Sequence, residues 1–284
     1  VVPTFNEAGN VVELRNRVAA VLPAVDWEMI YVDDDSPDGT AAAVRELAQR
    51  DSRVRCIQRI GRRGLSSACI EGMLASSAPI VAVIDADLQH DERLLPAMFD
   101  ALRGDDLDVV VGSRYAEGGS MEGWDRTRVA TSRFATRLSR LVLKADLQDT
   151  MSGFFMIRRA AVERCVRAGM SGVGFKILLD LFATSPEPLR CREFPYEFRN
   201  RFSGESKLDT MVAWEFFMML LDHYLGRVVP IRFIAFSLVG LLGLGVHLLV
   251  LATLFRGVGA SFLVAQTAAT LVAMTFNFAV NNVL

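Results

Sequence analysis

The sequence predicts an α/β domain with a mostly parallel sheet, followed by transmembrane α-helices. Short runs rich in Val and Ile alternate with amphipathic, helix-length segments up to about residue 112. Acidic or glycine-rich turns follow several of these runs, and two long apolar stretches come at the end of the chain. Strand–helix repetition at this spacing is typical of right-handed βαβ units, which build parallel sheets.

The predicted elements of the first part alternate between strand and helix. Each strand is a short apolar run, and each helix has apolar residues at helical spacing. The predicted strands are residues 1–2, 28–32, 54–58, 80–84 and 108–111. The predicted helices are residues 13–22, 40–50, 65–75 and 92–102. No G-x-G-x-x-G follows the first strand and no G-x-x-x-x-G-K-[ST] occurs, which disfavours a nicotinamide or flavin domain and a P-loop nucleotidase.

The most informative motif is Asp85-Ala86-Asp87, which directly follows the strand predicted at 80–84. Ligands of open α/β sheets bind at the carboxyl ends of the strands, where these carboxylates fall. Together with Gln89 they offer hard oxygen ligands of the kind that Mg²⁺ or Mn²⁺ prefers, usually shared with substrate phosphates. A departing nucleoside diphosphate needs such charge neutralisation. D-x-D alone also occurs by chance in ordinary acidic turns, so the neighbouring motifs must decide.

Three further motifs follow predicted strands and are expected at the same edge of the sheet. They are Pro3-Thr4-Phe5-Asn6-Glu7, Val32-Asp33-Asp34-Asp35 and Gly112-Ser113-Arg114. We expect Asp34 to accept hydrogen bonds from a base or ribose, and Phe5 or Pro3 to lie against a nucleoside ring. Acidic turns with Ser, Pro and Gly are common loop chemistry when isolated, but several at successive strand ends indicate a nucleotide site.

The end of the chain predicts two transmembrane helices. No side chain carries a formal charge from Phe233 to Phe255 or from Gly257 to Leu284, and both stretches exceed the roughly 20 apolar residues that a spanning helix needs. The predicted loop between them is residues 256–259. A buried core hairpin is the alternative. Because no Met precedes Val1, we also expect the chain to be a fragment of a longer protein.

Charge excludes one class of partner. The formal net charge of the chain is −2, and only Arg232 and Arg256 are charged after Arg227, so the first part is more acidic than the whole. An acidic domain argues against nucleic acid as the partner.

A basic helix is predicted between the two parts. Its basic residues recur at helical spacing beside an apolar stripe of Phe134, Leu138 and Leu141, an arrangement typical of a helix in an anionic membrane interface. The basic residues are Arg133, Arg137, Arg140 and Lys144. A solvated surface helix is the alternative. Residues 211–227, which are rich in aromatic side chains, are predicted to form a juxtamembrane amphipathic helix.

The motifs together resemble glycosyltransferase family 2, and more narrowly its dolichol-phosphate mannose synthase branch. Beyond those already named, they include Asp85-Ala86-Asp87-Leu88-Gln89-His90, Ser152-Gly153-Phe154-Phe155 and Gly204-Glu205-Ser206-Lys207. The resemblance implies a GT-A catalytic domain (Rossmann-like) over residues 1–210, the juxtamembrane helix over 211–227, and a truncated GtrA-like membrane domain over 228–284. Phe5 stands where the family usually has Tyr, which removes a hydroxyl and keeps the ring.

The resemblance also implies roles for individual residues. The nucleotide residues are Pro3, Phe5, Glu7, Val32 and Asp34. The residues for metal and donor phosphates are Asp85, Ala86, Asp87 and Gln89, of which Asp85, Asp87 and Gln89 are the ligands of Mg²⁺ or Mn²⁺. The phosphate contacts are Arg114, Arg201 and Lys207. The catalytic residues are Asp87, Arg114, Arg128 and Asp149, with Arg128 as a second clamp on the acceptor and Asp149 in a positioning role.

The activity implied by the resemblance is inverting transfer of mannose from GDP-mannose to a polyprenyl phosphate. Transfer of glucose from UDP-glucose to the same kind of lipid and a lipid-linked-sugar transport protein remain as alternatives. A catalytically inactive scaffold is disfavoured, because Asp85, Asp87, Gln89, Arg201 and Lys207 are all intact. The protein is expected to be a multi-pass membrane protein with its catalytic domain on the cytoplasmic side, where nucleotide-sugars are made, and a homo-oligomer is compatible with this interpretation.

Overall fold

The computed structural model describes residues 1–117, 120–121, 147–170, 172, 176–199 and 231–283. The chain divides into two compact units, Val1–Phe216 and Phe217–Leu284, which are described separately. The predicted domain boundaries at residues 210 and 227 fall outside the described residues and stay predictions. The same holds for the basic helix and for the juxtamembrane helix.

The first half of the unit Val1–Phe216 is a parallel sheet, as predicted. Its strands pair in the order β1-β2-β3, and all of them are parallel. A helix connects each strand to the next, as in βαβ units. The strands are β1 (Val2–Thr4), β2 (Met29–Asp33) and β3 (Val54–Gln58). The helices are α1 (Val11–Val21), α2 (Thr40–Arg50) and α3 (Leu65–Ala75).

The second half is a mixed sheet with the order β4-β7-β5-β8. Its strands are β4 (Ile80–Val83), β5 (Val109–Ser113), β7 (Phe155–Arg158) and β8 (Cys191–Pro195). Strand β7 runs antiparallel to both β4 and β5, whereas β5 and β8 are parallel. The helical elements are η1 (Glu92–Leu94), α4 (Leu95–Gly104), α6 (Arg159–Arg167) and α7 (Ile177–Thr184). A short parallel ladder joins β6 (Ser120–Met121) to β9 (Glu197–Phe198).

Backbone hydrogen bonds connect the two sheets through the start of the chain. The Val1 amino group donates to the Ala82 carbonyl at 2.7 Å, and the Ile84 N–H donates to the Val1 carbonyl at 3.1 Å. Strand β1 therefore lies beside β4, and the strand order across the unit is β3-β2-β1-β4-β7-β5-β8.

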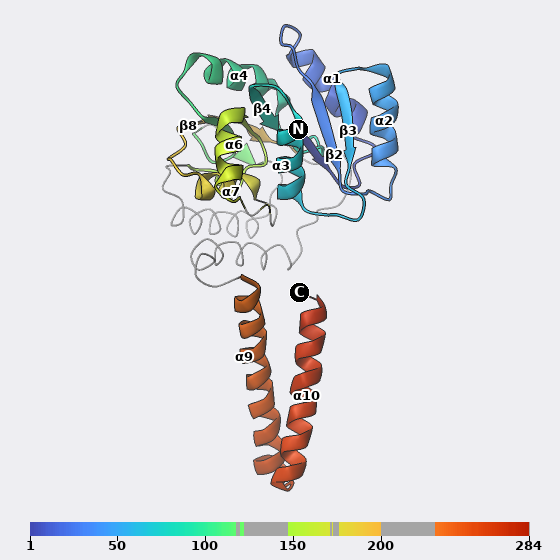
Figure 1. The fold of residues 1–284 in the computed structure, drawn as a ribbon, viewed down its shortest axis with the longest axis vertical. Helices are drawn as coiled ribbons and strands as arrows, with labels where there is room; N and C mark the ends of the chain where they lie inside the picture. Colours follow the sequence, from blue (N-terminus) through green and yellow to red (C-terminus); the bar gives the residue numbers. More distant parts are fainter. Residues whose placement is uncertain (118–119, 122–146, 171, 173–175, 200–230, 284) are drawn as a thin grey trace. The chain divides into compact units, whose positions relative to one another are not determined.

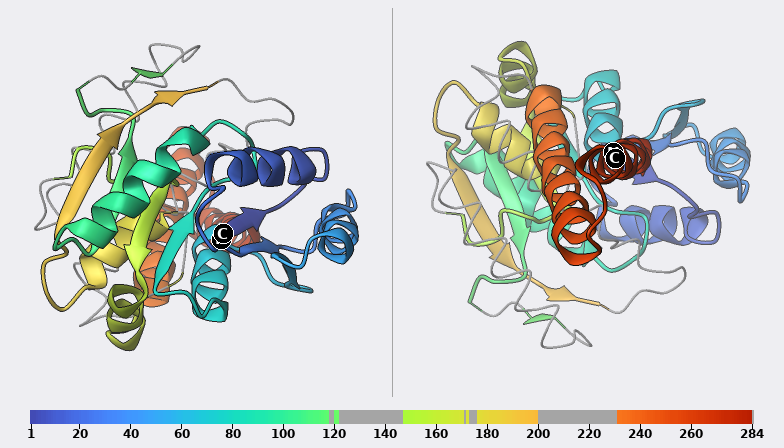
Figure 2. Two further views of the ribbon diagram at one scale, coloured as in Figure 1. Left: turned by 90° about the horizontal axis from the view of Figure 1, so that it is seen from above. Right: turned by 90° about the horizontal axis from the view of Figure 1, so that it is seen from below.

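Helices cover both faces of this sheet, which makes the unit a three-layer structure (Figure 2). Helices α1, α2 and α4 bury their apolar sides in one core cluster with Val110 and Met156. Helices α3, α6 and α7 do so in a second cluster with Val109 and Ile157. Side chains of adjacent strand residues thus enter opposite cores, as the two-residue period of a strand requires. The predicted α/β fold class is confirmed.

Two details of the strand prediction were wrong. Strands β7 and β8 were not predicted, and the antiparallel direction of β7 makes the sheet less uniformly parallel than expected. Strand β7 passes directly into α6 at Arg159, so no turn residue marks its end in the sequence. Three strands also extend further toward the carboxyl edge than predicted, since β1 includes Thr4, β2 includes Asp33, and β5 includes Ser113.

The second unit is a helical hairpin (Figure 1). Its described residues form α9 (Ile231–Ala252), a π-helical turn η2 (Thr253–Gly257) and α10 (Phe262–Val283). Phe236–Gly257 and Phe262–Asn282 are long and apolar enough to cross a membrane. The predicted loop began at Arg256, but the helical backbone continues through Gly257. The two helices approach each other closely at Gly243, where an added Cβ would overlap with the Asn277 side chain unless that side chain moved.

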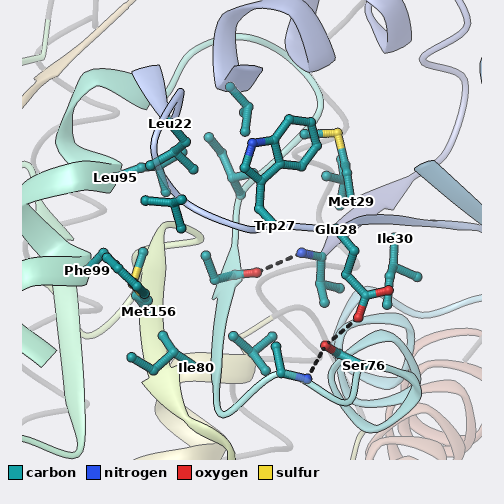
Figure 3. A pocket seen from close by; sticks show the side chains of 18 of the residues that line it. Leu22, Trp27, Glu28, Met29, Ile30, Ser76, Ile80, Leu95, Phe99 and Met156 are labelled. Carbon is teal, nitrogen blue, oxygen red and sulfur yellow. Dashed lines mark hydrogen bonds between the residues drawn. The ribbon is translucent and has the colours of Figure 1, made fainter. Parts of the chain in front are cut away.

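An apolar cavity of about 130 Å³ lies at the amino ends of β1, β2 and β4 (Figure 3). Leu22, Trp27, Leu95, Phe99 and Met156 are among the residues that line it. The motif residues follow the carboxyl ends of the same strands, so this cavity lies at the opposite edge of the sheet from the predicted site.

Candidate active site

The three motif loops at the carboxyl edge share an unusual backbone feature. Among the described residues, the non-glycine residues with positive φ are Asn6, Asp35 and Leu88, at 59°, 57° and 62°. Each lies in one of the loops that follow β1, β2 and β4. Left-handed backbone is uncommon for residues other than glycine, most of all for a Leu, and it clusters at functional sites. All three adjacent loops therefore contain a left-handed residue at one edge of the sheet, and the strain is greatest at Leu88, because Asn and Asp adopt this conformation more readily.

The carboxylates of the D-x-D motif have different surroundings. The side chain of Asp85 is 35% exposed, and its Oδ2 lies 3.1 Å from His90 Nε2. Asp87 is buried, and its Oδ1 accepts the Gln89 N–H at 3.1 Å. Ala86 between them is buried in the core that α1 and α4 cover. One carboxylate thus faces the open edge while the other stabilises the turn of the loop.

Gly153, which precedes β7, leaves room for the Asp85 carboxylate. A Cβ at this position would lie 2.7 Å from Asp85 Oδ2 and 3.2 Å from Asp85 Cγ. The antiparallel direction of β7 brings its first residues to the carboxyl edge, between the ends of β4 and β5. Gly153 therefore contributes to the site by having no side chain.

Replacing Gly153 with Ala is expected to lower kcat by about 10²-fold, because a displacement of about 1 Å at a reacting centre has an effect of that size. The Cβ must push the Asp85 carboxylate aside, since the atoms would otherwise overlap. Steady-state kinetics would measure the change. The matched control is Gly104→Ala at the end of α4, where a Cβ meets nothing within 4 Å. Equal kcat values for the two variants would contradict this account of Gly153.

Gln89 connects the D-x-D loop to the segment after β8. Its Nε2 donates to the Arg199 carbonyl at 3.0 Å, and the Arg199 N–H donates to the Gln89 carbonyl at 3.0 Å. The Arg199 guanidinium pairs with Asp91 at 2.8 Å and with Glu92 at 3.0 Å. The Gln89 side-chain amide is thereby oriented, with its N–H₂ group toward Arg199.

Asp34 is held by the loop after β3. Its Oδ1 accepts from Arg59 Nε at 2.7 Å, and its Oδ2 accepts from the Gly64 N–H at 2.7 Å. Arg59 is 1% exposed and also donates to Ser67 Oγ at 2.8 Å. Each carboxylate oxygen can accept more than one hydrogen bond, so Asp34 keeps acceptor capacity for a ligand. The position of the Asp34 carboxylate, however, depends on Arg59, which belongs to none of the sequence motifs.

The remaining residues that were predicted to contact the nucleotide lie on β1, β2 and the loop after β1. Pro3 and Val32 are paired across β1 and β2, and both are buried. The Glu7 N–H donates to Thr40 Oγ1 at 2.9 Å. The ring of Phe5 lies under the Arg63 guanidinium, 4.4 Å from its centroid, at a distance suited to a cation–π contact.

Arg114 and Asp149 form a buried, two-point ion pair. Arg114 Nε and Nη2 lie 2.8 Å from Asp149 Oδ2 and Oδ1, and the Arg114 N–H donates to Oδ2 at 3.1 Å. Asp149 is 0% exposed. Burial alone would raise the pKa of Asp149, but the hydrogen bonds and charge of Arg114 outweigh it, and the pKa is lowered. Asp149 is therefore an anion that holds Arg114 in place.

Lys176 adds a second cation to this ion pair. Withdrawal from water and the charge of Arg114 lower the pKa of Lys176 to about 8, while Asp149 and Asp85 act in the opposite direction. The charge of Lys176 is thus coupled to both the ion pair and the D-x-D motif. The sequence analysis missed this residue, because a single lysine before a helix carries no motif signal.

Three residues of the predicted site lie outside the described residues, namely Arg128, Arg201 and Lys207. The structure brings together the others at this edge of the sheet. Pro3 and Val32 lie on β1 and β2, and Asp149 lies in the segment before β7, where it pairs with Arg114. The rest lie in the loops that follow β1, β2, β4 and β5, namely Phe5, Glu7, Asp34, Asp85, Ala86, Asp87, Gln89 and Arg114. The sequence reasoning missed Arg59 and Tyr196. Arg59 lies in a polar stretch with Gln58, Arg62 and Arg63, so nothing in its sequence surroundings marks it as a buried charge.

The donor set of the D-x-D loop fits a divalent cation that is shared with a ligand. The described residues contain no group of three or more His, Cys, Asp or Glu side chains that could hold a metal ion alone. Asp85 and Asp87 supply two carboxylates, and Mg²⁺ typically takes one or two carboxylates together with substrate phosphates. The loop therefore suits a cation that arrives with a diphosphate rather than a permanent structural metal.

The fold and the site define a nucleotide-sugar transferase of the GT-A type, and comparison with known proteins agrees. Residues 1–166 match the model of glycosyl transferase family 2. The chain belongs to this family and is a glycosyltransferase. Residues 235–284 match the GtrA/DPMS transmembrane domain, which together with the two apolar helices makes the chain a membrane protein.

Curated relatives show which members of the family the chain is similar to. The chain is 35% identical to a dolichol-phosphate mannosyltransferase of Pyrococcus furiosus over 87% of this chain and 69% of that protein. It is also 35% identical to the dolichol-phosphate mannosyltransferase of Saccharomyces cerevisiae, over 79% of this chain and 85% of that protein. A polyprenol monophosphomannose synthase of Mycolicibacterium smegmatis is 31% identical over 73% of this chain and 79% of that protein.

A solved structure confirms the GT-A fold. Glucosyl-3-phosphoglycerate synthase from Mycobacterium tuberculosis, in complex with Mn²⁺, UDP and glucosyl-3-phosphoglycerate, matches with a TM-score of 0.56 and 17% identity. The match covers 78% of this chain and 77% of that chain. At this identity the likeness concerns the fold alone.

Proposed function

We propose that the protein transfers mannose from GDP-mannose to a polyprenyl phosphate with inversion, in a reaction that depends on Mg²⁺ or Mn²⁺. The observation that carries the proposal is the D-x-D loop at the carboxyl edge, with Asp85 open to solvent and Gly153 leaving room for its carboxylate. The names of the relatives supply the sugar and the class of acceptor.

The proposed metal would be held by Asp85, Asp87 and Gln89. When bound, it supplies charge neutralisation to the departing diphosphate. Because the protein ligands are few, we expect Mn²⁺ to bind the full chain at least about 10-fold more tightly with GDP present than without it. Titration of free Mn²⁺ by electron paramagnetic resonance would measure this. Equal affinity with and without GDP would contradict a cation shared with the donor.

The acceptor simplifies the chemistry required of the protein. A lipid phosphate is already an anion at neutral pH, so its oxygen can attack the anomeric carbon without a dedicated general base. Asp149 suits this scheme, because its carboxylate is paired with Arg114 and its pKa is lowered. The protein's contribution is then to position the two substrates in line and to stabilise the leaving group. We assign Arg201, Lys207 and Arg128 to phosphate contacts on the sequence motifs alone.

The experiment that tests this function uses the full chain in detergent. Radiolabelled GDP-mannose, UDP-glucose and UDP-galactose are each supplied with polyprenyl phosphate and Mg²⁺. We expect label in the lipid fraction with GDP-mannose and loss of that label with a chelator. Label from UDP-glucose instead would favour a glucosyltransferase, and no label from any donor, with transport of lipid-linked sugar in vesicles, would favour a transport protein.

The catalytic unit is proposed to face the cytoplasm. Arg227 and Arg232 precede the first apolar helix, whereas Arg256 is the one basic residue of the sequence between the two apolar stretches. Basic residues favour the cytoplasmic side, though the bias here is modest. We expect an amino-terminal epitope to survive protease in right-side-out vesicles and to be digested in inverted ones. Digestion in right-side-out vesicles would reverse the orientation.

A further inference from the structure

His90 is the centre of a buried chain of hydrogen bonds that ends at Asp85. Its Nδ1 lies 2.7 Å from the Tyr196 hydroxyl, and its Nε2 lies 3.1 Å from Asp85 Oδ2. The residue is 4% exposed, and its ring packs against Phe154 and Phe198 with centroid distances of 5.3 Å and 5.5 Å. Aromatic rings therefore surround the imidazole, and the two polar contacts lie at opposite ends of the ring.

The chemistry of the partners determines where the protons lie. An ionised carboxylate only accepts hydrogen bonds, so His90 Nε2 must carry the hydrogen that it shares with Asp85. In a neutral imidazole, Nδ1 is then an acceptor, and the Tyr196 hydroxyl is its donor. Burial raises the pKa of Tyr196 well above 10, so this hydroxyl keeps its proton. With a neutral imidazole the chain runs from Tyr196 through His90 to Asp85, and His90 Nε2 donates to Asp85.

The backbone at Gly153 restricts the Asp85 carboxylate from a second side. The Cα of Gly153 comes so close that a Cβ there would lie 2.7 Å from Asp85 Oδ2, the same oxygen that faces His90. The carboxylate therefore lies between the imidazole N–H and the backbone at Gly153, although its side chain is 35% exposed. An exposed aspartate without such contacts would sample several rotamers.

We propose that His90, oriented by Tyr196, is a positioning residue that holds the Asp85 carboxylate in the orientation required to bind a divalent cation together with the donor diphosphate. This inference rests on the proposed metal dependence. Hydrogen bonds to metal-binding carboxylates and imidazoles fix ligand orientation, and their loss commonly costs 10–100-fold in metal affinity. Neither His90 nor Tyr196 needs to touch the substrate for this role.

The test compares His90→Phe, His90→Gln and His90→Asn in the full chain. Phe keeps an aromatic ring and removes both nitrogens. Gln can place an N–H near the position of Nε2, whereas Asn places its amide nearer to that of Nδ1. We expect Mn²⁺ affinity in the presence of GDP to fall about 10–100-fold in His90→Phe and His90→Asn, and to recover at least in part in His90→Gln. His247→Phe, in the helical hairpin, is the matched control and should change nothing.

Two measurements separate positioning from a loss of structure. GDP binding without metal and the thermal unfolding midpoint should stay close to wild type in His90→Gln, and Tyr196→Phe should weaken Mn²⁺ binding less than His90→Phe does. Unchanged Mn²⁺ affinity in a folded His90→Phe variant would overturn the proposal, and so would a His90→Gln variant as weak as His90→Phe. If the wild type binds Mn²⁺ with GDP but transfers no mannose, the proposed function fails while a His90 effect on Mn²⁺ still supports the positioning role.

Discussion

Replacing Asp87 with Asn is expected to reduce mannosyl transfer at least about 10³-fold. A bound metal typically contributes several kcal/mol of transition-state stabilisation, and each 1.36 kcal/mol is a factor of ten in rate. Asn is neutral and a poorer ligand for a hard cation, so the donor diphosphate loses its counter-charge. The side chain of Asn can still accept the Gln89 N–H that Asp87 accepts, so the loop should keep its turn.

The assay measures transfer of labelled mannose to polyprenyl phosphate with saturating Mg²⁺ or Mn²⁺. The matched control is Asp100→Asn, the same chemical change at an exposed position on α4, which should keep wild-type activity. A chelator should abolish mannose transfer by the wild-type protein in the same assay. Near-normal transfer by a folded Asp87→Asn variant would remove Asp87 from the metal site.

Replacing Asp149 with Asn is expected to lower the free energy of unfolding by about 3–5 kcal/mol, the range found when one partner of a buried ion pair is removed. Asp149 is 0% exposed, and its loss leaves Arg114 without its anion beside the Lys176 charge. The backbone N–H groups of Gln148 and Asp149 stay anchored on Glu193, at 2.7 Å and 2.9 Å, so the effect should come from charge rather than from loss of the turn.

Denaturant unfolding of wild type and variant would measure this difference. Glu163→Gln is the matched control, because Glu163 pairs with Arg159 and Arg167 on the surface of α6, where ion pairs contribute little. Its effect should stay below about 1 kcal/mol. An Asp149→Asn variant as stable as Glu163→Gln would show that Arg114 finds another anion.

The same pair has a defined pH dependence. The folded pKa of Asp149 is lower than its ordinary value, so the unfolded chain binds a proton more readily than the folded chain. The stabilisation is therefore complete above the ordinary aspartate pKa and is lost as the pH falls through the lowered one. The difference in unfolding free energy between wild type and Asp149→Asn should be constant near neutral pH and shrink only under acidic conditions.

Much of this protein follows from local patterns in the sequence. The period-two and helical patterns placed the parallel βαβ units, because burying a sheet on both faces requires apolar strands and amphipathic helices. The two apolar stretches specified the helices α9 and α10, since their length and lack of charge suit a lipid environment. The D-x-D motif and the motifs after β1 and β2 were placed at one edge, because parallel strands all end on the same side.

The contacts that orient those motif residues could not be read from the sequence, since they join residues far apart in the chain. Strand β7 inserts antiparallel between β4 and β5, and only this insertion brings Gly153 against Asp85. Arg59 reaches Asp34 across 25 positions, and Tyr196 reaches His90 across 106. Local residue preferences specify the elements and the edge at which the loops meet, whereas the orientation of each side chain depends on non-local packing and hydrogen bonding, which exist only once the sheet has formed.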